Sequence, residues 1–314
     1  MKRFLIKISI FLLCFCVVSV ALLWFTFSVA APQFETSYVG AFEDKINRLN
    51  SIQEPKIILV GNSNLAFGMD SAMLEEATGM PVVNLGGHGG LGNAFQTNMA
   101  KFNIGQGDIV IVCHTNYDAY GISDPALAWI TIENRPEYLS LIPKEEYFDM
   151  LKALPSYVGK TLFAYFTGTG NEPIEGFYSR DAFNEYGDIY YSRTQTTYAF
   201  NESNGKVPGI SEKDVGLVND LNAFCKERGA VCLVAGYPIA YGTFTDSAEE
   251  FEKFQNELDA QLDCEIISDF TDYFMDTSYF YDTQYHLTDE GVQVRTQLLI
   301  DDISKWQENS KASE

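Results

Sequence analysis

The first residues that could carry chemistry follow a continuous apolar run. Lys56-Ile57-Ile58-Leu59-Val60 predicts a strand buried on both faces, and Gly61-Asn62-Ser63-Asn64 comes directly after it. A serine on a tight strand-to-helix turn exposes its hydroxyl, and its backbone amide points to where an oxyanion would form. A serine in a turn is also a common turn residue or helix cap, so Ser63 alone does not define a site. Leu65 stands where the GxSxG elbow has its last glycine, which argues against an α/β-hydrolase.

A histidine near the other end of the chain could supply the base that such a serine needs. His286 lies in a loop just before a helix expected over 288–306, with Thr288 as its N-cap. Asp282, four residues earlier, could orient the imidazole as in a Ser-His-Asp triad. The alternative is a surface histidine that caps its own helix. By itself, His286 would fit that alternative better.

A glycine-rich turn follows the second expected strand. Gly87 to Gly92 matches GxGxxG, which is also the pattern of a dinucleotide-binding turn. In a dinucleotide-binding βαβ unit this pattern follows the first strand. It is accompanied by an acidic residue about 20 positions later, at the end of the next strand. Neither condition is met, so the turn suits backbone oxyanion donors better than a nucleotide.

A third polar group, His114-Thr115-Asn116-Tyr117-Asp118, follows the strand expected over 108–113. The side-chain amide of Asn116 could donate a hydrogen bond to an oxyanion. It could equally cap the turn, and so could Asp118.

The rest of the pattern alternates between strands and helices. We expect further strands at 81–84, 230–236 and 264–268, and helices at 70–77, 93–104, 211–229, 246–261 and 288–306. This alternation is typical of a doubly wound α/β fold, whose sites lie at the C-terminal ends of the strands. Residues 117–210 interrupt it and hold 11 of the 18 tyrosines. These aromatic residues could stack on sugar rings or pack an inserted subdomain against its host.

The N-terminal residues indicate the compartment. Residues 8–31 form an uncharged run long enough to cross a bilayer as one helix, and three basic residues precede it. The positive-inside rule places residues 1–7 in the cytoplasm and exports everything after Pro32. Val29-Ala30-Ala31 resembles a signal-peptidase site, but the run is longer than a secretory apolar region, so we favour an uncleaved anchor. We expect residues 32–54 to form a stalk, or a lid over the domain edge, with an amphipathic helix near 36–50. One domain should follow over 55–306, with a disordered tail over 307–314.

The charge is divided unequally between these parts. The chain of 314 residues carries 21 basic and 43 acidic residues, a net charge of −22. Residues 1–34 contribute +3, so the exported part carries −25. Such a surface repels phosphate backbones, which argues against a nucleic-acid partner. No CxxC pair suggests a zinc site, and we expect no metal or cofactor. Cys113, Cys225, Cys232 and Cys264 are expected to be buried thiols, although export would permit a disulfide.

The order of these features resembles the SGNH (GDSL-like) hydrolase superfamily. Its four short blocks match Gly61-Asn62-Ser63-Asn64, the turn from Asn84 to Gly89, Asn116, and His286 with Leu287 and Gly291. The third block here lacks the usual glycine before its asparagine. In the last block the aspartate usually stands three residues before the histidine, where this chain has Thr283. The resemblance spans 56–306 and implies a flavodoxin-like three-layer sandwich with a parallel sheet.

The resemblance also implies roles for these residues. Ser63 is the implied nucleophile, His286 its base and Asp282 the residue that orients the base. The oxyanion donors would be the amides of Ser63 and of Gly89 (or Gly87), with Asn116. Four further residues are candidate substrate contacts: Asn62, Asn64, His88 and His114.

An outward-facing SGNH-like domain on a membrane anchor is also similar to envelope proteins that move acyl groups onto extracellular glycans. Those proteins act in alginate O-acetylation and teichoic-acid D-alanine transfer, beside multi-span membrane acyltransferases. We therefore expect an envelope esterase or O-acyltransferase acting on polysaccharide. The second hypothesis is a non-catalytic protein that uses the same cleft to bind glycan or a membrane partner. Thr115 and Thr283 differ from the residues that the family has in its third and last blocks, and these differences favour the second hypothesis.

Overall fold

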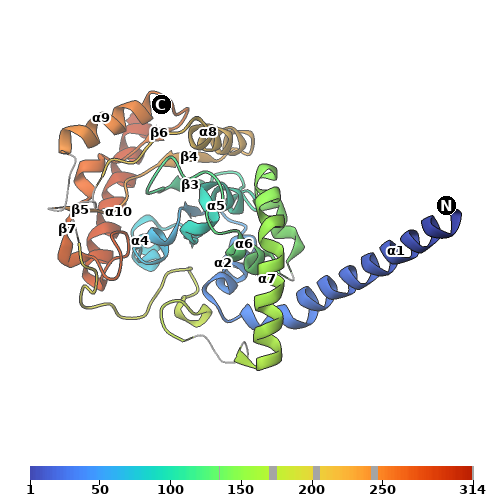
Figure 1. The fold of residues 1–314 in the computed structure, drawn as a ribbon. Coiled ribbons are helices and arrows are strands. Elements are labelled where there is room, and N and C mark those ends of the chain that lie inside the picture. The colour runs from blue at the N-terminus through green and yellow to red at the C-terminus, as the bar shows by residue number, and fades with distance from the viewer. Residues whose placement is uncertain (134, 170–174, 201–205, 242–246, 313–314) are drawn as a thin grey trace.

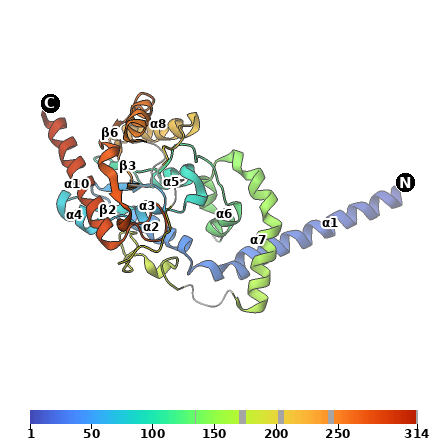
Figure 2. The same cartoon turned by 60° about the vertical axis from the view of Figure 1, so that its left-hand side comes forward.

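The structure is a computed structural model that describes residues 1–133, 135–169, 175–200, 206–241 and 247–312. The fold is α/β, with a parallel central sheet and one long apolar helix that projects away from the domain (Figures 1 and 2). The alternation of strands and helices predicted from the sequence is therefore confirmed at this level.

The central sheet has five strands in the order β2-β1-β3-β4-β6, and each adjacent pair is parallel. From β1 the chain passes to β2 on one side of the sheet, whereas from β3 it passes to β4 and β6 on the other side. The connections that follow β1 and β3 therefore leave the edge of the sheet in opposite directions. The strands are β1 (Ile57–Val60), β2 (Val82–Asn84), β3 (Ile109–Val112), β4 (Val231–Val234) and β6 (Glu265–Ile266). A second, parallel pair consists of β5 (Ile239–Tyr241) and β7 (Phe274–Asp276), and the sequence pattern did not predict it.

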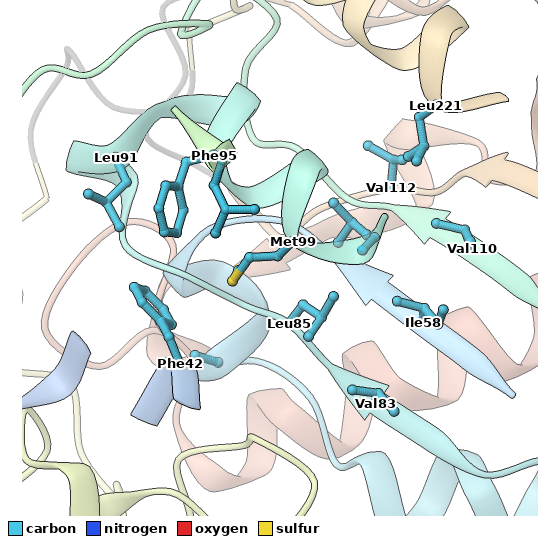
Figure 3. Close-up of a cluster of buried hydrophobic side chains, with 14 of the residues drawn as sticks. Phe42, Ile58, Val83, Leu85, Leu91, Phe95, Met99, Val110, Val112 and Leu221 are labelled. Atoms are coloured by element: carbon cyan, nitrogen blue, oxygen red, sulfur yellow. The ribbon is translucent and has the colours of Figure 1, made fainter. Parts of the chain in front are cut away.

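Successive side chains of the sheet enter two different cores because strand residues alternate between faces. Ile58 and Val60 join one core with Phe95 and Leu221, as Figure 3 shows in part. Ile57 and Leu59 join the other core with Leu299. Helices therefore cover both faces. The strands β1, β2 and β3 are buried throughout, as their apolar runs predicted, whereas Val231 at the start of β4 is 40 % exposed.

Most of the helices lie close to the predicted positions, but the two α-helices within 117–210 were not predicted. Their bounds are α1 (Lys2–Phe25), α2 (Ala41–Ser51), α3 (Ser63–Ala66), α4 (Ser71–Thr78), α5 (Gly92–Ala100), α6 (Pro125–Ile132), α7 (Tyr147–Thr167), α8 (Glu212–Glu227), α9 (Ala248–Asp259) and α10 (Asp289–Ala312).

Local capping explains several of these bounds. The side chain of Asp70 accepts a hydrogen bond from the Met73 amide at the start of α4, and Gly79 ends the helix with φ of 67°. At α10, the Thr288 hydroxyl accepts from the Gly291 amide at 3.3 Å, as expected of its N-cap.

One helical stretch, Lys2–Ala30, is long and apolar enough to cross a membrane. It combines α1 with a π-helical end over Thr26–Ala30. At 1.5 Å per residue its 29 residues span about 43 Å, more than the roughly 30 Å of a bilayer core.

The segment expected to be a stalk belongs to the main core instead. Phe42 and Leu49 of α2 are 0 % exposed and pack in the same cluster as Ile58 and Val60 (Figure 3). Lys45 is buried as well, and its ammonium group donates to the carbonyls of Asn84 and Gly187. The amphipathic helix is present, and its apolar face covers the sheet, so the segment is closer to the expected lid than to the expected stalk.

Two other expectations need revision. In the described part of 117–210, α6 and α7 pack together as a helical unit, so the insertion is more regular than its sequence indicated. At the C-terminus, α10 continues to Ala312, so the expected disordered tail is helical over 307–312. The four cysteines outside α1 are free. Cys113, Cys225 and Cys232 are buried as predicted, whereas Cys264 is only partly buried.

The role of α2 in the core can be tested with one substitution. We expect Phe42→Ala to lower the free energy of unfolding by about 3–5 kcal/mol, because it removes a fully buried ring. Phe102→Ala, at a ring that is 38 % exposed, is the control and should cost less than about 1 kcal/mol. Denaturant unfolding of the full chain in detergent measures both values. Equal losses in the two variants would mean that α2 is a detachable stalk.

Candidate active site

Ser63 lies immediately beyond the C-terminal end of β1, at the first position of the short helix α3. Asn62 caps this helix, since its side-chain oxygen accepts from the Asn64 amide at 3.0 Å. This cap fixes the turn, and Ser63 remains partly exposed at the edge of the sheet. The predicted exposed serine after the first strand is therefore present.

Ser63 meets His286 across 223 positions of sequence. The distance from Ser63 Oγ to His286 Nε2 is 2.8 Å, and the distance from His286 Nδ1 to Asp282 Oδ1 is 2.7 Å. Both distances allow hydrogen bonds. A serine, an imidazole and a carboxylate linked in this order form the arrangement in which a base can accept the serine proton.

The four-residue spacing between Asp282 and His286 is made possible by Thr283. The Thr283 hydroxyl accepts hydrogen bonds from the amides of Tyr285 (3.2 Å) and His286 (3.0 Å). These bonds close a turn that accommodates the extra residue. Thr283 occupies the position where the resembled family has its aspartate, and here it shapes the loop instead.

Asp282 is held from two sides. Its Oδ1 faces His286, and its Oδ2 accepts from the Tyr178 hydroxyl at 3.1 Å. Partial burial works to raise the pKa of Asp282, but the hydrogen bond and charge of His286 and the hydrogen bond of Tyr178 outweigh it. The net effect is a lowered pKa, so the carboxylate stays ionised beside the imidazole.

The imidazole has a fixed plane. The ring of Phe67 stacks on His286 with centroids 3.9 Å apart and an interplanar angle of 6°. His286 is only 5 % exposed, so this contact and the two hydrogen bonds define its orientation. Phe67 and Tyr178 were not singled out in the sequence, because neither belongs to a motif.

Asn64 is structural rather than a substrate contact. It is 0 % exposed, and its amide donates to Asn62 Oδ1 and to the carbonyl of Cys113. Arg295 of α10 donates to the Asn64 carbonyl at 2.6 Å and to Asn64 Oδ1 at 2.7 Å. The sequence signal for this contact is an arginine among the apolar positions of the last helix, and the motifs do not include it.

The two glycines expected to donate to an oxyanion, Gly87 and Gly89, differ in whether their amides are already hydrogen-bonded. The Gly87 amide donates to the Gly61 carbonyl at 2.9 Å, so it is already engaged. Among the described residues, the amides of Ser63 and Gly89 donate to no acceptor. Gly89 is also exposed, and a Cβ added to it would meet no heavy atom within 4 Å. Gly89 is therefore the better candidate of the two.

Asn116 is not hydrogen-bonded to the other site residues. Its buried Oδ1 has no partner within the described part of the chain. The link between this loop and the serine turn comes from Thr115 instead, whose hydroxyl accepts from Asn62 Nδ2 at 2.8 Å. The role of Asn116 stays a prediction, and Asn62 is engaged in holding the two loops together.

The other two histidines lie in different surroundings. His114 is 1 % exposed, it contacts Thr97 Oγ1 at 3.2 Å, and burial lowers its pKa to about 3. Such a residue is a neutral core histidine and does not fit the expected substrate contact. His88 is partly exposed, and its Nδ1 accepts from the Gly90 amide. Burial lowers the pKa of His88 despite the charge of Asp124, and the proximity of His286 adds to this effect.

No group of three or more His, Cys, Asp or Glu side chains suited to a metal ion occurs among the residues that the structure describes. Comparisons with protein-family models, curated proteins and solved structures find no match for this chain. The chemistry of the site must therefore be inferred from its own geometry.

The function of Asp282 can be tested without knowing the substrate. We expect Asp282→Asn to slow the reaction of Ser63 with a fluorophosphonate on the order of 10³–10⁴-fold, because the imidazole loses its orienting carboxylate. The measurement is the rate of covalent labelling of the full chain, followed by mass spectrometry. Asp276→Asn changes an exposed acid in the same region and should leave the rate unchanged. A similar rate in both variants would contradict a positioned triad.

Proposed function

We propose that this protein is a serine esterase or O-acyltransferase of the SGNH type that acts on acyl esters of a cell-envelope polysaccharide. The single observation that carries the proposal is the hydrogen-bonded chain from Ser63 through His286 to Asp282, at 2.8 and 2.7 Å. Three residues from two distant segments converge at the carboxyl edge of the sheet, where α/β folds place their sites.

The strand order gives further support. The central sheet has the order β2-β1-β3-β4-β6, which is 2-1-3-4-5 when only its own strands are counted, and this order supports the flavodoxin-like sandwich that the resemblance implies. The serine turn, the glycine turn and the Asn116 loop follow β1, β2 and β3. Because these strands are adjacent, the three loops share one edge of the sheet.

The mechanism is a double displacement. His286 accepts the Ser63 proton as Oγ attacks the ester carbonyl, and Asp282 stabilises the resulting imidazolium. The tetrahedral oxyanion receives hydrogen bonds from the free amides of Ser63 and Gly89, and from Asn116. The intermediate collapses to an acyl-serine as the imidazolium returns its proton to the leaving alcohol. Water or a sugar hydroxyl then attacks the acyl-serine in the same way, which restores Ser63.

The location follows from the N-terminal helix and its flanking charges. We infer a single-pass anchor with Lys2, Arg3 and Lys7 in the cytoplasm and the domain outside, by the positive-inside rule. Tyr178 is 45 % exposed beside Asp282 and offers an aromatic surface for a sugar ring. A multi-span membrane acyltransferase is the partner that would deliver an acyl group to such a site.

The catalytic role of Ser63 can be tested with a chromogenic ester. With p-nitrophenyl acetate and the full chain, we expect Ser63→Ala to lower turnover by about 10⁴-fold or more, because the nucleophile is lost. Ser51→Ala, at an exposed serine at the end of α2, is the matched control and should keep the parent rate. Turnover is followed by release of p-nitrophenol.

A second measurement separates catalysis from binding. Acetylated envelope polysaccharide should lose acetate in the presence of the parent chain and keep it with Ser63→Ala. If the parent binds the polysaccharide but neither releases nor transfers acyl groups, and Ser63 is not labelled by a fluorophosphonate, the protein is a non-catalytic glycan-binding protein. That result would overturn the proposed function.

A further inference from the structure

The helix α7 is apolar on two opposite faces. One face packs on the domain through Met150 and Tyr157, which are buried. The opposite face is open to solvent although it carries large apolar side chains. Its most exposed members are Phe148 (67 %), Leu151 (57 %), Phe163 (68 %) and Phe166 (74 %). Phe148 and Phe166 are about five helical turns apart and therefore lie on the same side of the helix. Soluble surfaces seldom leave such a stripe uncovered.

The position of α7 relative to α1 suggests what covers this stripe. Figures 1 and 2 both show α7 running across the C-terminal end of α1 rather than alongside it. Phe25, at the end of α1, contacts Tyr165 (5.5 Å between centroids) and Phe166 (6.2 Å). The exposed stripe is thus continuous with the end of the apolar helix.

The connection between the two helices is tightly packed. Phe27 contacts Trp129 of α6 and Tyr157 of α7, each with centroids 5.5 Å apart. Thr26 and Ala30 are buried at the same junction. Because aromatic packing of this kind fixes orientation, α7 keeps a defined height relative to the end of α1.

The charges on α7 also favour contact with a membrane. The exported part carries −25, yet α7 contains Lys152 and Lys160 against the single acid Asp149. Lys152 lies over the ring of Phe148 at 4.3 Å from its centroid. Aromatic residues with lysines beside them are typical of helices that lie in the interface of an anionic membrane.

We propose that α7 is a second membrane contact, lying in the headgroup region of the outer leaflet with its exposed stripe inserted among the lipids. This inference rests on the proposed membrane span of α1 and adds a partner surface that the span alone does not provide. The bilayer covers Phe148, Leu151, Phe163 and Phe166, to a depth of about 5–10 Å. Two non-parallel contacts then fix the tilt of the domain, and with it the height of Ser63 above the lipid.

The test uses the full chain in lipid nanodiscs of mixed phosphatidylcholine and phosphatidylglycerol. A background with Cys14→Ser, Cys16→Ser and Cys264→Ser leaves only buried thiols. An environment-sensitive fluorophore is attached to Phe148→Cys or Phe166→Cys, and spin-labelled phosphatidylcholine is the quencher. We expect both positions to lose about half of their emission or more, as interfacial probes do.

Glu252→Cys on α9 is the exposed control and should not be quenched. Val18→Cys within α1 is the positive control.

The possible outcomes separate this inference from the anchor. If Val18→Cys is quenched but positions 148 and 166 are not, α1 spans the membrane and the α7 contact is refuted. If none of the three is quenched, the span and this inference both fail. A blue-shifted emission at 148 without lipid quenching would mean that a second copy of the chain covers the stripe, which also overturns it.

A paired substitution checks that the whole stripe acts together. In the chain labelled at position 148, Phe166→Glu should weaken quenching about two-fold or more, because a charge on the lipid-facing side opposes insertion. Phe166→Leu keeps the apolar surface and should leave quenching at the parent level. Equal quenching in the two variants would contradict insertion along the full length of α7. Ester turnover of each variant shows independently whether the proposed site is intact.

Discussion

The buried guanidinium of Arg295 joins the two ends of the fold at the point where the site forms. It is 1 % exposed and reaches from α10 to both the carbonyl and the side chain of Asn64. A buried charge is tolerated only when hydrogen bonds replace its water, so this fork constrains both elements strongly. Asn64 follows Ser63, and α10 follows the loop that carries His286. The distance between Ser63 and His286 therefore depends in part on this side chain, together with the backbone bond from Leu287 to Phe67.

Around this constraint, the remaining contacts orient single groups. Phe67 fixes the plane of the imidazole, Thr283 folds the loop that carries Asp282, and Tyr178 holds the second carboxylate oxygen. Each comes from a different segment, so the geometry depends on the completed tertiary structure. Groups held in this way lose little further freedom when a substrate binds, which is the condition for efficient catalysis.

Much of this arrangement could be predicted from the sequence because it depends on local rules. Continuous β-branched runs indicated β1 and β3, and Asp70 with Gly79 marked both ends of α4. Ser63, His286 and Asp282 could be named because strand ends and a helix N-terminus limit where chemistry occurs.

The supporting residues could not be named, since the contacts of Phe67 and Arg295 depend on packing between distant segments. The helix α7 was missed for a related reason: apolar on two faces and interrupted by Pro155, it has no clear amphipathic period.

The path of the chain between α1 and the sheet has a consequence for the reach of the domain. Ala30 and Ala31 are buried and α2 lies in the core, so no extended linker separates the apolar helix α1 from the sheet. A flexible linker would let a tethered enzyme sample a volume that grows with linker length. With α1 in the bilayer, this domain searches only a thin shell next to the lipid. For the proposed reaction, encounters with the glycan would then be essentially two-dimensional, because the polymer would have to approach the membrane.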